Sequence, residues 1–123
     1  MGMYTEILIK ANIREDLPIE AKEVLEYLFL GKTMPTILPK HDLFETTRWR
    51  LIGNCNSFYH IPQVFNFFSG TQLFSRSDLK NNGCVIELFF DWIQPYINAE
   101  IGVCIGYKWY EEHDAPTLMY KCK

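Results

Sequence analysis

Two short segments place a histidine beside carboxylates, a combination that can bind a divalent metal or transfer protons. The first comprises His41, Asp42 and Glu45, and the second comprises Glu111, Glu112, His113 and Asp114. A metal or an acid–base pair would require the two segments to meet in space, which their separation in the sequence leaves open. Acidic residues are also common in solvated turns. We therefore predict no metal ligand and no catalytic residue in either segment.

Other reactive side chains lack the neighbours that catalysis requires. Ser57, Ser75 and Ser77 stand in no nucleophile-elbow motif and beside no obvious general base. Gly102 and Gly106 are not followed by the Lys-Ser or Lys-Thr of a phosphate-binding loop. The four cysteines are widely spaced, as expected for small buried thiols in a reducing compartment. These patterns favour a binding protein over an enzyme and predict no cofactor.

Basic and aromatic side chains alternate at Arg48, Trp49 and Arg50, and Arg76 follows in a later predicted strand. If these strands are neighbours, the three arginines form a small cationic patch. Such a patch could hold an acidic partner, a nucleotide phosphate or single-stranded nucleic acid. The alternative is an exposed sheet face on which the arginines pair with acidic residues across strands.

The phenylalanine-rich segment VFNFFSGTQLF predicts a hairpin that turns at Ser69-Gly70. Its phenylalanines, Phe65, Phe67, Phe68 and Phe74, fall on both faces of the hairpin, so a sheet covered on one side cannot bury all of them. The long loop, the second helix or another chain must cover the remainder. We predict that these residues and Trp49 form a partner-binding or dimer surface, with simple burial as the alternative.

Composition and charge bound the class of protein. A chain of 123 residues forms about one domain, residues 1–123, and its 48% hydrophobic content indicates a dense core. A net charge of −3 without a lysine or arginine block argues against duplex nucleic acid and membrane surfaces as partners. No apolar run reaches the roughly 20 residues of a membrane span, and the N-terminus lacks a signal-peptide pattern. We expect a cytoplasmic protein of a bacterial host.

Hydrophobic periodicity predicts the secondary structure. The expected elements are a strand at 4–13, a helix between Asp16 and Gly31, a loop at 32–47, strands at 48–53 and 56–61, a hairpin at 63–68 and 71–78, a helix ending near Gln94, and strands at 101–110 and 117–122. In the first helix, Asp16 is the expected N-cap and Gly31 the left-handed closing residue.

The segment from 81 to 110 carries the strongest pattern. In its helix, Glu87, Asp91 and Gln94 form one narrow polar stripe. In the strand at 101–110, large apolar residues alternate with small ones, which predicts one large apolar face and a second face close to another element.

Helices separated from runs of hairpins indicate an α+β protein. We expect one antiparallel sheet of about five to six strands with both α-helices packed on one face, in the order β-α-β-β-β-(β)-α-β-β. We prefer this plan to a ferredoxin-like split βαβ arrangement, because the middle of the chain contains too many predicted hairpins.

Four phrases of the C-terminal half, RSDLKN, FFDWIQPYI, GYKWYEE and PTLMY, resemble a group of small uncharacterised proteins carried by phages and prophages. The resemblance rests on Leu79, Trp92, Pro95, Tyr96, Gly106, Tyr107, Glu111, Glu112, Pro116 and Tyr120. It implies a compact α+β fold in a phage or prophage context and transfers no functional residue.

Two functional hypotheses follow. The first is a non-enzymatic protein-binding module, an inhibitor or immunity-type protein of a phage or mobile element that covers a site on a partner protein and forms a homodimer. The second is a small-molecule binding protein or small enzyme with a pocket between the 32–47 loop and the sheet. There Arg48, Arg50 or Arg76 would hold a nucleotide or another anion. The absence of catalytic motifs and the surplus of aromatic residues favour the first.

Overall fold

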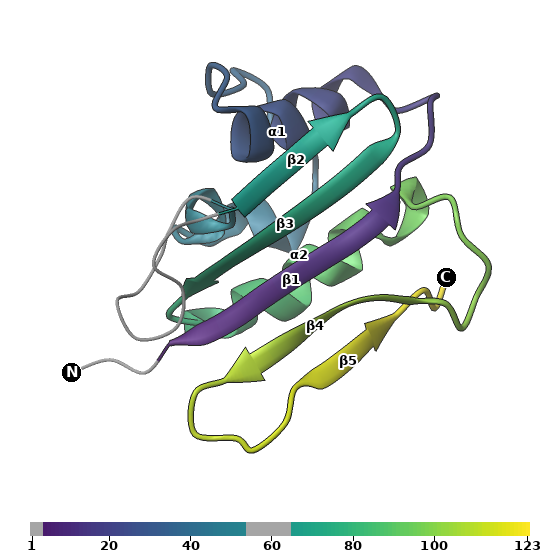
Figure 1. The fold of residues 1–123 in the computed structure, drawn as a ribbon. Helices are drawn as coiled ribbons and strands as arrows, with labels where there is room; N and C mark the ends of the chain where they lie inside the picture. The colour runs from purple at the N-terminus through teal and green to yellow at the C-terminus, as the bar shows by residue number, and fades with distance from the viewer. Residues whose placement is uncertain (1–3, 54–64) are drawn as a thin grey trace.

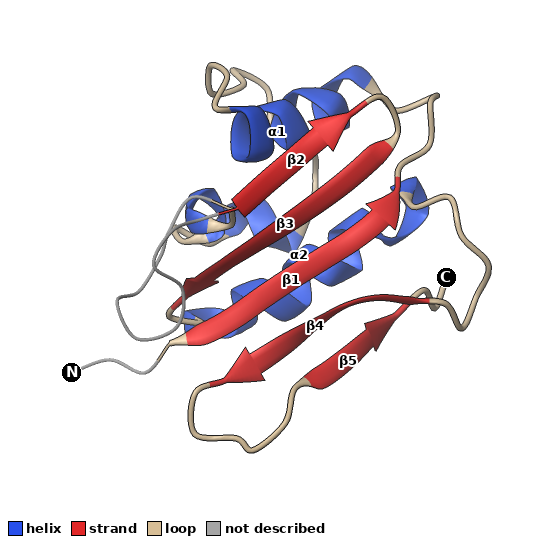
Figure 2. Ribbon diagram, in the orientation of Figure 1, coloured by secondary structure: helices blue, strands red, loops and turns tan. Residues whose placement is uncertain are grey.

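The computed structural model describes residues 4–53 and 65–123 and has two layers (Figure 1). The strands are β1 (Thr5–Asn12), β2 (Phe65–Ser69), β3 (Gln72–Leu79), β4 (Cys104–Tyr110) and β5 (Thr117–Tyr120). They form one antiparallel sheet, and α1 (Ile19–Leu30) and α2 (Val85–Ile93) lie on a single face of it (Figure 2). The predicted α+β fold is confirmed.

The strand order β2-β3-β1-β4-β5 gives the first four strands the split βαβ connectivity. α1 joins β1 to β2 with β3 between them, and α2 joins β3 to β4 with β1 between them. The sequence-based preference against this arrangement is therefore wrong. It counted a strand at 48–53 that does not form, and β5 is an addition at the β4 edge.

The segment at 48–53 differs from the predicted strand because one of its side chains is buried in the helix layer. Trp49–Leu51 is a short 3₁₀ helix, and Trp49 is only 3% exposed. The Trp49 ring lies 5.0 Å from Phe44 and 5.8 Å from Tyr27, centroid to centroid. The predicted strand at 56–61 lies outside the described residues.

α1 begins later than predicted. Pro18 occupies the N-cap position in an extended conformation, and no side chain caps the helix. Asp16 is thus two positions too early to reach the first free amides, and its carboxylate instead accepts from Arg14 Nε at 3.0 Å. The closing residue is as predicted, because Gly31 is left-handed with φ 69°.

α2 ends where predicted, and Gln94–Tyr96 continues as a 3₁₀ turn around Pro95. Gln94 is not part of an exposed stripe, however, because it is 3% exposed. Its amide Nε2 donates to the Tyr120 carbonyl at 2.9 Å, and its Oε1 accepts from the Cys122 amide at 3.0 Å. This buried polar side chain therefore joins α2 to the end of β5.

β4 is shorter than the predicted strand at 101–110. A bulge between Cys104 and Gly106 interrupts the alternation, and Ile101 lies in a turn with 74% exposure. The expected single apolar face is therefore wrong: Ile105 is in the core, whereas Tyr107 points to the opposite face. The close approach at Gly106 is to the backbone of β1, the neighbouring strand of the same sheet, and not to a separate element packed on the small-residue face as predicted.

Candidate functional site

Figure 1 looks onto the sheet face that neither helix covers, which we call the open face. The alternation of the strands assigns side chains to it, because Ile7 and Ile9 belong to the core whereas Leu8 and Lys10 point away from it. By register, the open-face residues are Glu6, Leu8, Lys10 and Asn12 of β1, Phe65, Phe67 and Ser69 of β2, Gln72, Phe74, Arg76 and Asp78 of β3, Tyr107 and Trp109 of β4, and Leu118 and Tyr120 of β5.

One row of these side chains crosses all five strands. Leu8 lies opposite both Arg76 and Tyr107, Phe65 lies opposite Arg76, and Leu118 lies opposite Tyr107. Side chains at opposite positions of an antiparallel pair are close enough to contact one another. The row therefore forms a continuous strip of mainly apolar surface.

The open face is unusually apolar for a sheet surface that meets water. Phe65 is 55% exposed, Phe67 and Leu118 are each 48% exposed, and Tyr120 is 47% exposed. The uncovered side of an antiparallel sheet normally carries polar side chains. These four side chains lie on the two edge strands, β2 and β5, on either side of the central strands. Exposed apolar side chains gathered on one face are typical of a protein interaction surface.

The predicted distribution of the hairpin phenylalanines is confirmed. Phe65 and Phe74 pack edge to face on the open face, with ring centroids 5.3 Å apart, and Phe67 lies opposite Phe74. Phe68 points to the helix side and packs against the core. Trp49 is buried in the helix layer and is therefore not part of this surface.

A charged cluster occupies the centre of the open face. Glu6 Oε2 accepts a hydrogen bond from Arg76 Nε at 3.0 Å and another from the Tyr107 hydroxyl. The Glu6 hydrogen bond raises the pKa of Arg76, so the guanidinium is held charged and paired. Burial, together with the hydrogen bond to Glu6, raises the pKa of Tyr107 to about 12. Because Glu6 neutralises Arg76, this arginine is poorly suited to hold an external anion.

The hydrogen bond from Tyr107 to Glu6 predicts that the Tyr107 phenol loses its proton at a higher pH than an ordinary tyrosine. Because its pKa is raised, the stabilising contribution of Tyr107 is complete below pH 10 and is lost as pH rises toward 12. We expect the tyrosinate absorbance of the folded protein to show a step near pH 12 that Tyr107→Phe removes. Tyr120→Phe, on the same face, is the control and should retain it. A step that persists in Tyr107→Phe would contradict the assignment.

Arg48 and Arg50 do not join Arg76. They lie at the start and in the middle of the 3₁₀ turn at Trp49–Leu51, whereas Arg76 is on β3. The strand geometry that would place Arg48 and Arg50 beside Arg76 is wrong, because Trp49–Leu51 is a 3₁₀ turn and not a strand. Sequence reasoning also missed Leu8, Tyr107, Leu118 and Tyr120, although the alternation of their strands was a usable signal.

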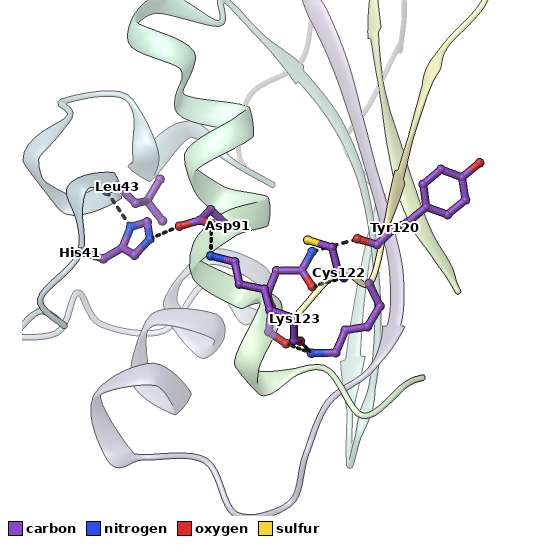
Figure 3. Close-up of polar contacts among 8 residues, drawn as sticks. His41, Leu43, Asp91, Tyr120, Cys122 and Lys123 are labelled. Carbon is purple, nitrogen blue, oxygen red and sulfur yellow. Dashed lines mark hydrogen bonds and ion pairs between the residues drawn. The ribbon is translucent and has the colours of Figure 1, made fainter. Parts of the chain in front are cut away.

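The His41 ring contacts Leu43 and Asp91 (Figure 3). Its Nε2 lies 2.9 Å from Asp91 Oδ2, and its Nδ1 accepts from the Leu43 amide at 3.0 Å. Nδ1 is therefore unprotonated and Nε2–H is the donor, so neither nitrogen is left to act as a base. Lys123 Nζ also pairs with Asp91, at 2.5 Å, and this pairing, more than the His41 contact, lowers the pKa of Asp91.

Residues 111–114 form the turn between β4 and β5. The His113 ring lies 5.3 Å from the Tyr110 ring, centroid to centroid. The main-chain carbonyl of His113 accepts a hydrogen bond from Trp109 Nε1 at 2.9 Å. Over residues 4–53 and 65–123, no group of three or more His, Cys, Asp or Glu residues is placed to hold a metal ion. Both histidine segments thus have structural contacts of their own.

Within residues 4–53 and 65–123, the 32–47 loop contributes to two cavities of about 350 and 510 Å³, and no residue of a strand lines either of them. The smaller one is formed with α1 and α2, between residues such as Pro18, His41 and Asp91. None of the three arginines lines either of these two cavities. The predicted pocket between the loop and the sheet stays a prediction.

Three cysteines, Cys84, Cys104 and Cys122, are free as predicted, but they are exposed and not buried. They lie at the start of α2, at the start of β4 and after β5, where the chain is at the surface. Cys55 lies outside the described residues.

In comparisons with known proteins, no family model, curated protein or solved structure matches the chain significantly. In the part of the chain that the structure describes, neither helix has the length and apolarity that crossing a bilayer requires.

Proposed function

We propose that the chain is a non-enzymatic protein-binding module, an inhibitor or immunity-type protein that uses the open face of its sheet to cover a site on another protein. One observation carries the proposal. Phe65, Phe67, Leu118 and Tyr120 are about half exposed on a face that neither helix covers. A phage or mobile-element origin and a cytoplasmic location belong to the same proposal.

The electrostatics of the open face favour a protein over a polyanion. Arg76 is neutralised by Glu6, which leaves Lys10 as a single unpaired cation on the central strand and no cluster of positive charges. Binding of nucleic acid depends on clustered cations that pair with phosphates. Exposed aromatic side chains around a paired charge instead match the aromatic-rich core of protein interfaces.

We further propose that two copies cover each other's open faces when no other partner is present. Five strands spaced by about 4.8 Å make a face roughly 24 Å wide, and strands of about six residues make it about 20 Å tall. The plane is about 500 Å², and side chains enlarge its accessible area toward the ~800 Å² per partner of a standard interface.

Affinity capture from a lysate of the native host tests the function. Wild-type protein, the double variant Phe65→Ser with Phe67→Ser, and Ile37→Ser should be compared in parallel. Ile37 is 67% exposed and lies in the loop after α1. Ile37→Ser is therefore the control, because it removes exposed apolar surface away from the open face. We expect one protein to be retained by wild type and Ile37→Ser and reduced at least tenfold with the double variant. Equal retention by all three, or no retained protein, would contradict the proposal.

A further inference from the structure

A hollow opens on the open face where β1 and β4 separate. Their pairing ends at Ile9 and Gly106, while β1 continues to Asn12. The chain approaching β4 instead touches β1 near its end, where the Asn98 amide donates to the Asn12 carbonyl at 2.7 Å. Figure 1 shows the two strands diverging toward the C-terminal end of β1. A cavity of about 570 Å³ occupies this divergence.

The lining combines an apolar wall with polar groups. Phe67 and Phe74 form one side, and Val103, which is 47% exposed, lines the other side. The side-chain amides available among the lining residues belong to Asn12, Gln72 and Asn98. The volume lies in the range of sites that accept a small molecule or a large side chain.

Lys10 gives the hollow its charge. It lines the cavity and is exposed, and within the described residues its ammonium group makes no hydrogen bond or ion pair. Arg76, the neighbouring cation of the open face, is instead held by Glu6. The unpaired Lys10 ammonium attracts a negatively charged group, and the phenylalanine rings beside it favour an apolar one. The hollow therefore suits an occupant that carries both groups.

We infer that the hollow receives an anchor from the partner protein: a bulky apolar side chain, preferably aromatic, next to a carboxylate. This inference rests on the proposed function and names the partner chemistry. The apolar side chain packs on Phe67 and Phe74, and the carboxylate pairs with Lys10. A hollow that is continuous with an exposed aromatic surface is the usual place for an anchoring side chain in an interface.

Titration with two small probes, followed by NMR of the labelled protein, tests the inference. 3-Phenylpropionate carries an aromatic ring and a carboxylate, and phenethylamine carries the same ring and a cation. We expect 3-phenylpropionate to shift the amide signals of Lys10, Phe74 and Asn98 and to bind roughly tenfold more tightly than phenethylamine, as expected for one nearby charge. Lys10→Glu, an exposed substitution, should reverse the preference, and Phe67→Ala should weaken both probes.

Absence of shifts at these signals, or equal binding of both probes, would overturn the inference. AMP serves as a third probe in the titration, because a nucleotide also carries an aromatic ring and a negatively charged group. If AMP binds at least tenfold more tightly than 3-phenylpropionate, the hollow is a nucleotide site and the anchor assignment is wrong. Phe67 is common to both experiments. Their failures are nevertheless distinguishable: capture reports whether the open face holds a protein, whereas the probes report which chemistry the hollow accepts.

Discussion

Replacing Gly106 with alanine should lower the free energy of unfolding by about 3 kcal/mol, at the upper end of the cost of overpacking. A Cβ at this position would lie 2.0 Å from the Leu8 carbonyl oxygen and 3.0 Å from the Ile9 Cα. Those atoms are backbone of the central part of β1, which is paired on both sides with β3 and β4. The strands must therefore separate to accommodate the methyl group.

Urea unfolding measures this loss as a lower midpoint at unchanged slope. Gly31→Ala is the control, because Gly31 is left-handed at φ 69° but a methyl group added there would meet only open space. Its cost should be about 1 kcal/mol, from the backbone conformation alone. Equal losses in the two variants would contradict the account of the β1–β4 contact. The contact matters for function because it aligns Leu8 with Tyr107 in the open-face row.

The fold class was predictable because most elements have clear periodicity. Residues of β1 alternate, the hairpin turns near Ser69-Gly70, and Pro95 ends α2. These signals are local, so the chain around them folds as its pattern predicts. The α+β class follows from their order alone.

The strand order and the segment at 48–53 were not predictable in the same way. A three-residue 3₁₀ turn that buries Trp49 has the same local composition as a short strand with one apolar face. Its conformation is decided by the Phe44 and Tyr27 rings that surround Trp49. Such contacts are tertiary and leave no trace in the spacing of residues 48–53.

Half of the candidate site could be found from the sequence. Phe65, Phe67 and Phe74 were singled out because a hairpin cannot bury phenylalanines on both faces. The side of the sheet to which Tyr107 points was not predictable, because the bulge at Cys104–Gly106 changes the alternation along β4. Leu118 lies on β5, where regular alternation was a usable signal. The contact between Tyr107 and Glu6 joins residues 101 positions apart, so spacing could not indicate it.

The second large effect concerns the open face itself. The double variant Phe65→Ser with Phe67→Ser should weaken self-association by about 700-fold or more, because buried aromatic anchors at an interface contribute about 2 kcal/mol or more each. Both side chains are about half exposed in the free chain, so their loss should change the stability of the fold by only about 1 kcal/mol. Urea unfolding of the variant checks that the fold is retained.

Light scattering over a concentration series tests the central claim most directly, because it needs only the protein itself. The wild type and Ile37→Ser should approach twice the monomer mass as concentration rises, and the Phe65→Ser, Phe67→Ser variant should remain a monomer. A wild type that stays monomeric at the highest attainable concentration, or a double variant that dimerises like the wild type, would contradict the assignment of the open face as a protein-binding surface.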